Sequence, residues 1–167
     1  MKIVSKLLIF IFLILSISVF AQDEQKLPSV TIKQLDGKSM DLATYGENGK
    51  LTVISFWATW CTPCKKELDA INDIYEDWQE EFDVELLAIT IDNARQLTKV
   101  PGIVMTKGWE FDVLAADQNE IQTALNFQTI PQTFLVDKEG NIVYSHSGYV
   151  PGDEFELEDH IREEAEK

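Results

Sequence analysis

Residues 51–64 read LTVISFWATWCTPC, a nearly continuous apolar run that leads directly into two cysteines separated by two residues. An apolar run without alternation is typical of a strand that is buried on both faces. Pro63 stands where the first turn of a helix tolerates proline. Beyond it, apolar side chains recur at helical spacing, at Leu68, Ile71, Tyr75 and Trp78. The stretch therefore predicts a buried strand followed by a helix, with both cysteines at the junction.

Further strands and helices are predicted on both sides of this unit. A hairpin is expected around the turn at 35–38, and a loop at 45–50. Strands are expected at 83–91, 111–115, 133–136 and 142–146, and helices at 93–98, 118–126 and 153–166. Pro101 and Gly102 are expected to interrupt the helical region that starts at 93, and Asp153 to cap the last helix. Because strands and helices alternate before a final hairpin, we expect a three-layer α/β sandwich around a central mixed sheet.

The composition excludes several functional classes. The chain has 167 residues and a formal net charge of −15, and its length fits one domain. Because the acidic excess leaves no basic stretch, the protein is not expected to bind nucleic acid or to attach to anionic lipid by charge. Its two cysteines form a single pair rather than a disulfide scaffold.

The first 21 residues have the layout of a secretory signal peptide. Two lysines precede an apolar run over 7–20, and the small side chains at its end fit a cleavage site. Counted from Ile3, the segment is also long enough for a retained membrane anchor, and both outcomes stay open. We expect a signal peptide over 1–21, a flexible mature N-terminus over 22–26 and one domain over 27–167. The domain is expected to work outside the cytoplasm, in the periplasm, where disulfides persist.

A cysteine pair at the start of a helix is suited to thiol–disulfide exchange. The thiolate is the reactive form, and a helix N-terminus stabilises it through unpaired N–H groups and the positive end of the helix dipole. Cys61, at or just before the first turn, gains most and is expected to attack, while Cys64 resolves the mixed disulfide. A structural zinc site needs about four ligands, and the two histidines, His146 and His160, lie far along the chain and are given no role. A purely structural disulfide is a weak alternative, because so short a loop constrains the unfolded chain little.

A second motif lies late in the chain. Residues 129–137 read TIPQTFLVD and place Pro131 directly before a strand. X-Pro bonds adopt the cis form at modest cost. A cis Pro131 would turn the backbone of Ile130 outward beside the cysteines, where its N–H and C=O could pair with an extended substrate segment. A trans proline at a strand start is the alternative that the sequence leaves open.

The chain resembles a thioredoxin-fold protein in its two motifs, FWATWCTPCKKE at 56–67 and IPQTFLVD at 130–137, and in Gly140 and Gly148. More narrowly, it resembles the extracytoplasmic thiol-disulfide oxidoreductases of the TlpA/ResA kind. The hairpin expected around 35–38 matches the N-terminal extension of that family. The resemblance therefore implies a thioredoxin-like sandwich with an N-terminal hairpin extension.

The resemblance also implies an activity and its partners. The enzyme would use no cofactor beyond a redox-active Cys61–Cys64 disulfide, and it would reduce disulfides in exported proteins, commonly apocytochromes before haem attachment. Its electrons would come from a membrane thiol-disulfide transporter, and contact with the membrane itself would require a retained N-terminal segment. A disulfide oxidase or isomerase stays open as the alternative activity.

The resemblance assigns a further role to an acid three residues after the second cysteine, which here is Glu67. Cytoplasmic thioredoxins instead carry a buried acid on the first core strand, where this chain has Ser55. The i, i+3 step puts Glu67 on the face of Cys64. There, desolvation would raise the pKa of Glu67 and let its carboxyl exchange a proton with Cys64. A solvated helix glutamate is the alternative.

The remaining expected site residues are Trp60, Thr62 and Pro63. The two residues between the cysteines are uncharged, which favours a reductant over an oxidant, and Trp60 is expected to shield the disulfide and contribute to docking. A thiol peroxidase is disfavoured because no matching proline precedes Thr59. A copper or haem binding module that uses the thiols as ligands is disfavoured because clusters of methionine and histidine are missing.

Overall fold

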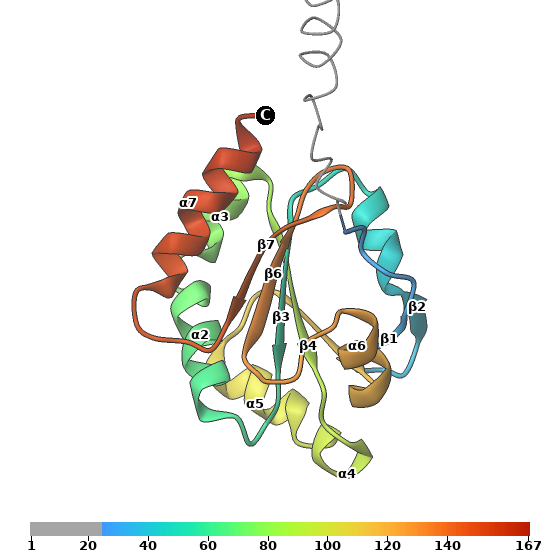
Figure 1. Cartoon of the computed structure of the whole chain (residues 1–167). Coiled ribbons are helices and arrows are strands. Elements are labelled where there is room, and N and C mark those ends of the chain that lie inside the picture. Colours follow the sequence, from blue (N-terminus) through green and yellow to red (C-terminus); the bar gives the residue numbers. More distant parts are fainter. Residues whose placement is uncertain (1–24) are drawn as a thin grey trace, which may run out of the picture.

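The computed structural model describes residues 25–167, and a seven-stranded sheet forms their centre (Figure 1). The strands are β1 (Thr31–Gln34), β2 (Ser39–Asp41), β3 (Thr52–Trp57), β4 (Glu85–Thr90), β5 (Asp112–Ala116), β6 (Gln132–Val136) and β7 (Ile142–Ser147). Their order in the sheet is β2-β1-β5-β4-β3-β6-β7. The pairs β3–β4 and β4–β5 are parallel, and every other pair in this order is antiparallel. The predicted mixed sheet and the N-terminal hairpin are thus confirmed.

Strand β3 lies inside the sheet because its residues can be buried on both faces. All six are buried, as the apolar run predicts, and Phe56 and Trp57 are among the largest buried side chains. Since β3, β4 and β5 run in parallel, their carboxyl ends meet at one edge of the sheet. The loops that follow such ends commonly build the functional site of an α/β protein, and the cysteine pair follows β3.

The helices form the two outer layers. They are the 3-10 helix η1 (Leu42–Glu47) and the α-helices α2 (Thr62–Asn72), α3 (Tyr75–Phe82), α4 (Ala94–Leu97), α5 (Val100–Lys107), α6 (Gln118–Ala124) and α7 (Asp153–Ala165). Figure 1 shows α2, α3 and α7 together on one side of the sheet, where they contact one another, and α6 with η1 on the other side. The predicted three-layer sandwich is therefore confirmed.

The helical region after the cysteines differs from its prediction. The four apolar residues of the predicted face are buried as expected, but Leu68 and Ile71 belong to one helix and Tyr75 and Trp78 to the next. The break falls at Ile74, whose φ of −124° and ψ of 2° leave the helical region. Pro101 does not interrupt a helix either. It lies in the first turn of α5, where the missing N–H has no partner to lose.

Two further boundaries were predicted wrongly. Part of the loop expected at 45–50 is helical, since η1 extends to Glu47 and begins where the Asp41 side chain accepts a hydrogen bond from Ala43 N. Asp153 is not the cap of α7 but its first residue, because Gly152 takes the cap position with a φ of 112°. Because a positive φ of this size favours glycine, Gly152 rather than Asp153 takes the N-cap position.

The predicted signal peptide over 1–21 lies outside the described residues. Of the segment 22–26, expected to be flexible, the structure describes Gln25 and Lys26. The carbonyl of Gln25 accepts a hydrogen bond from the first residue of β7 at 2.8 Å, and Lys26 forms a β-bridge with Asn141. Backbone bonds therefore hold these two residues against the β6–β7 turn. Within residues 25–167, no helix is both long and apolar enough to cross a membrane.

Candidate active site

The two cysteines follow strand β3 and lie at the N-terminal end of α2. They form a disulfide, and their Cα atoms are 5.4 Å apart. Cys61 is the N-cap of α2, and its Sγ accepts a hydrogen bond from the backbone N–H of Cys64 at 3.3 Å. Cys64 is fully buried, whereas Cys61 is 5% exposed. Because Cys61 sits at the helix N-terminus and is the less buried of the two cysteines, this placement favours Cys61 for attack and Cys64 for resolution.

Asp92, which the sequence did not single out, holds the loop between β3 and Cys61. Its Oδ2 accepts a hydrogen bond from Thr59 N at 2.8 Å, and its Oδ1 accepts one from Thr59 Oγ1 at 3.0 Å. The hydroxyl of Thr90, at the end of β4, also donates to Asp92 at 2.8 Å. The neighbouring strand thereby fixes the loop that carries Trp60 and Cys61. An acid directly after a buried strand was the available signal, but its partner on the next loop is visible only in the fold.

The carboxyl of Glu67 is buried, as predicted. Its Oε2 accepts a hydrogen bond from Ser55 Oγ at 3.0 Å, and its Oε1 accepts one from Thr133 Oγ1 at 2.7 Å. Ser55 and Thr133 lie opposite each other in the β3–β6 register, so the sheet supplies both donors. Burial raises the pKa of Glu67 from 4.5 to about 7, although the two hydroxyl hydrogen bonds and the charge of His146 act in the opposite direction. The alternative of a solvated glutamate is therefore wrong.

The residues expected to face a substrate around the cysteines are exposed. Trp60 is 58% exposed, directly before Cys61. Thr62 and Pro63 are also exposed, in the first turn of α2. All three lie within two residues of Cys61 in the chain.

The late motif lies at the same edge of the sheet. The peptide bond between Ile130 and Pro131 is cis, which decides between the two forms that the sequence left open. Gln132 pairs with Phe56 near the end of β3, and β3 leads into the cysteine loop. Pro131 is buried and Ile130 is half-buried. The fold thus brings the two motifs, far apart in the sequence, to one end of the central strand pair.

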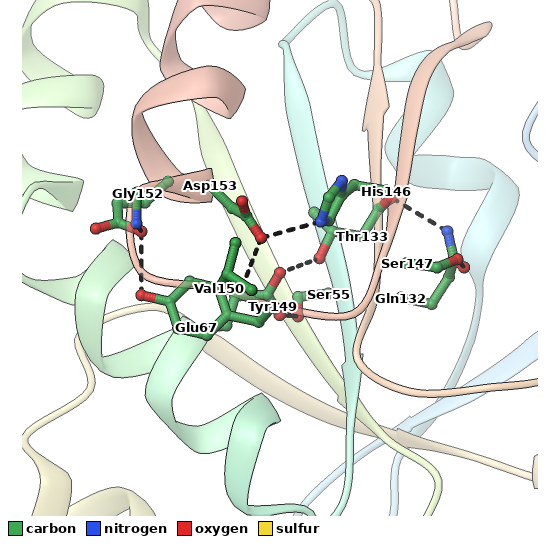
Figure 2. A network of polar contacts seen from close by, with 11 residues as sticks. Ser55, Glu67, Gln132, Thr133, His146, Ser147, Tyr149, Val150, Gly152 and Asp153 are labelled. Atoms are coloured by element: carbon green, nitrogen blue, oxygen red, sulfur yellow. Dashed lines mark hydrogen bonds and ion pairs between the residues drawn. The ribbon is translucent and has the colours of Figure 1, made fainter.

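A second group of polar side chains lies beyond Glu67, at the start of α7 (Figure 2). His146 Nε2 lies 3.0 Å from Asp153 Oδ2, and the same oxygen accepts a hydrogen bond from Val150 N at 2.7 Å. His146, to which the sequence gave no role, belongs to this group. Burial alternates along β7, and Tyr144 and His146 lie on its half-buried face. The alternation along β7 indicates that one face of the strand is half-buried. The sequence does not show that a helix covers that face.

The metal-binding alternatives would require further ligands. Within residues 25–167, no group of three or more histidine, cysteine, aspartate or glutamate side chains is arranged to hold a metal ion. His146 pairs with Asp153, and His160 lies 3.8 Å from Glu163 on the same helix.

Comparison with known proteins agrees with the two motifs. A model of the AhpC/TSA family matches residues 24–145, which include the cysteine pair and Pro131. The thiol-disulfide oxidoreductase ResA of Bacillus thuringiensis subsp. konkukian is 30% identical over 121 residues, which are 72% of this chain and 67% of that protein. The thioredoxin-like protein YneN of Bacillus subtilis is 29% identical over 136 residues, 81% of this chain and 77% of that protein. The solution structure of an uncharacterized thioredoxin-like protein from Porphyromonas gingivalis is 41% identical, with a TM-score of 0.74, and covers 84% of this chain and 92% of its own.

Proposed function

The chain belongs to the AhpC/TSA family of thioredoxin-like proteins and is a thiol-disulfide oxidoreductase, and we propose on this basis that it reduces disulfides in exported proteins. One observation carries the proposal. A cysteine pair sits at the N-terminus of α2, and a buried carboxyl, Glu67, lies one turn beyond its second member. The first feature provides a nucleophile and the second a proton acceptor, which are the two groups that dithiol–disulfide exchange requires.

The reaction begins with the reduced pair. The Cys61 thiolate attacks one sulfur of the client disulfide and forms a mixed disulfide, while the other client sulfur leaves as a thiolate. The N-terminal end of α2 stabilises the Cys61 thiolate before the attack through the N–H of Cys64 and the helix dipole. The mixed disulfide then holds the client on the exposed side of Cys61.

The second step needs a proton acceptor because Cys64 is fully buried. Burial disfavours a thiolate, so Cys64 must lose its proton as it attacks. We assign this proton to the Glu67 carboxylate. The Cys64 thiolate attacks the Cys61 sulfur, the second client sulfur leaves as a thiolate, and the Cys61–Cys64 disulfide closes. The client gains two electrons, the enzyme loses two, and one proton rests on Glu67.

The pKa of Glu67, raised to about 7 by burial, suits this role. A group titrating near the working pH can both accept and return a proton. The hydroxyls of Ser55 and Thr133 stabilise the carboxylate enough for it to form. Without them, burial alone would leave the carboxyl protonated and unable to take the proton from Cys64.

Client docking is assigned to the two motifs at this edge. Trp60, Thr62 and Pro63 provide exposed contacts around Cys61. On the other side, the backbone of Ile130, next to Pro131, would pair with an extended client segment in the manner of an added strand. Extended segments fit such a site better than folded surfaces, because backbone hydrogen bonds recognise the strand irrespective of its side chains.

We further propose that the enzyme works outside the cytoplasm. This rests on the signal-like layout of residues 1–21, with 22–26 as a connecting segment and 27–167 as the catalytic domain. Clients would be exported proteins, apocytochromes among them. Electrons would return to the disulfide from a membrane thiol-disulfide donor. The exchange itself requires no cofactor.

The reduction potential of the Cys61–Cys64 pair tests the direction of the reaction. The full-length protein is equilibrated with graded dithiothreitol or glutathione buffers, and free thiols are counted. A reductase is expected to give a value near or below about −250 mV, close to thioredoxin at about −270 mV. A value above about −150 mV, towards the strong periplasmic oxidant at about −120 mV, would refute reduction and support the alternative, disulfide formation.

A further inference from the structure

The Glu67 carboxyl borders a small cavity that the cysteines do not line. The cavity has a volume of about 10 Å³ and lies among α2, β6, β7 and the first turn of α7. Its polar lining consists of Glu67, Thr133, Tyr144, His146, Asp153 and Glu154. About 10–15 Å³ is the smallest space that holds one water molecule, which also needs two to four polar partners. The space between Glu67 and His146 therefore has the size and the lining for one bridging water.

His146 stands between this cavity and the solvent. Its side chain is 30% exposed, and Asp153, its partner at 3.0 Å, is 17% exposed. In the β6–β7 register, His146 lies opposite Thr133, the residue whose hydroxyl donates to Glu67. In Figure 2 the His146–Asp153 pair lies beside the Glu67–Thr133 contact, and both pairs line the cavity.

The proton on Glu67 needs a path to solvent through another group, because the direct hydrogen-bond partners of Glu67 cannot release a proton to water. Ser55 is fully buried and Thr133 is 2% exposed, and neutral hydroxyls hold no excess proton near neutral pH. A proton taken from Cys64 nevertheless leaves the oxidised enzyme where the pH of the solution lies above the pKa of Glu67, which burial raises to about 7, and it then needs a path to water. An imidazole exchanges protons readily near neutral pH, and His146 combines that chemistry with access to solvent.

We propose that His146, positioned by Asp153, passes protons between the Glu67 carboxyl and the solvent through this cavity. The proposal rests on the proposed function, because it concerns the proton that Cys64 gives to Glu67. Transfer from Glu67 to His146 restores the carboxylate and leaves an imidazolium beside the Asp153 carboxylate. The imidazolium then loses its proton to water. When the enzyme is reduced again, a proton passes in the opposite direction, from solvent through His146 to Glu67.

Several charged and titratable groups surround His146. The titratable groups that face His146 or its immediate neighbours are Asp153, Glu154, Glu156 and His160 from α7, Tyr144 from β7, Tyr149 from the loop before α7, and Glu67 from α2. The carboxylates of the first turn of α7 stabilise an imidazolium by Coulomb attraction. A charged His160 and the N-terminal end of α7 act in the opposite direction.

The test follows closure of the Cys61–Cys64 disulfide after the reduced full-length protein is mixed with a peptide disulfide, between about pH 6 and pH 9. His146→Ala is expected to slow closure about tenfold, less than the 10²–10⁴-fold effect of a direct acid–base group. Added imidazole, which fits the space vacated by the side chain, should restore the rate. His160→Ala, the matched control at the other histidine of the chain, should neither slow closure nor respond to imidazole.

A double variant tests whether His146 acts through Glu67. In Glu67→Gln, His146→Ala should cause no further loss and imidazole should rescue nothing, because coupled residues are not additive. His146→Gln, which keeps a polar side chain beside Asp153, guards against misfolding. If this variant folds and closes at the wild-type rate at every pH while Glu67→Gln is slow, the His146 route is refuted and the proposed function stands. If the wild-type protein performs no exchange, the proposed function itself fails.

Discussion

Glu67→Gln should stabilise the oxidised protein at high pH. The folded-state pKa of Glu67 is raised by burial to about 7, so the native state holds a proton that the unfolded chain releases near 4.5. The contribution of Glu67 to the unfolding free energy is therefore fully present below about pH 4.5 and is lost as the pH rises towards 7. Each pKa unit is worth about 1.36 kcal/mol, so the rise from 4.5 to about 7 corresponds to about 3 kcal/mol. Glutamine resembles the protonated acid, with one acceptor oxygen and N–H donors for Ser55 and Thr133. Because it does not titrate, it does not lose unfolding free energy as the pH rises.

Urea unfolding of the disulfide form measures this difference, because the cysteines do not titrate in that form. At about pH 8, Glu67→Gln should exceed wild type in unfolding free energy by about 3 kcal/mol more than it does at about pH 4.5. Glu80→Gln, at an exposed position of α3, should not change the pH dependence. An equal difference between Glu67→Gln and wild type at both pH values would show that the carboxyl is not desolvated, and the proton-acceptor role would lose its physical basis.

Three further changes have defined outcomes. Cys64→Ser should leave attack intact but block resolution, so a mixed disulfide with the client accumulates and is visible by mass spectrometry. Asp92→Ala should lower the unfolding free energy by about 3 kcal/mol, since it leaves the buried Thr90 hydroxyl and the two half-buried donors of Thr59 unpaired. Urea unfolding measures the loss. Gly140→Ala should prevent stable folding or lower the melting temperature strongly, because its Cβ would lie 2.5 Å from the carbonyl oxygen of Gly46 at a φ of +82°; a calorimetric scan decides.

The central strand and the cysteine junction could be predicted from the sequence because their causes are local. An apolar run of the length of β3 has few alternatives to a doubly buried strand, and Pro63 marks a helix start wherever the chain folds. Glu67 was predictable for a related reason. Its spacing from Cys64 fixes the helix face, and neighbouring apolar residues identify that face as buried.

The residues that were missed depend on contacts between distant elements. Asp92 matters because its strand ends beside the Thr59 loop, a contact that spans 33 residues of sequence. The position of His146 beside Asp153 was not predicted, because alternation along β7 identifies two faces but not which of them a helix covers. The break between α2 and α3 is set by tertiary packing, since no proline or glycine marks it in the sequence.

The position of Glu67 also explains why β3 needs no acid where this chain has Ser55, because α2 supplies the buried carboxyl. This chain departs here from the cytoplasmic thioredoxins, which carry their buried acid on this strand. Instead, a hydroxyl from β3 and another from β6 converge on a carboxyl that comes from α2. A second buried acid at Ser55 would place two carboxyls within hydrogen-bond distance, and one of them would stay protonated. Ser55 instead donates a hydrogen bond and limits the rise in the pKa of Glu67. Ser55→Ala should therefore raise the pKa of Glu67 further and shift the pH dependence of disulfide closure upward, whereas an unchanged profile would show that closure does not depend on Glu67.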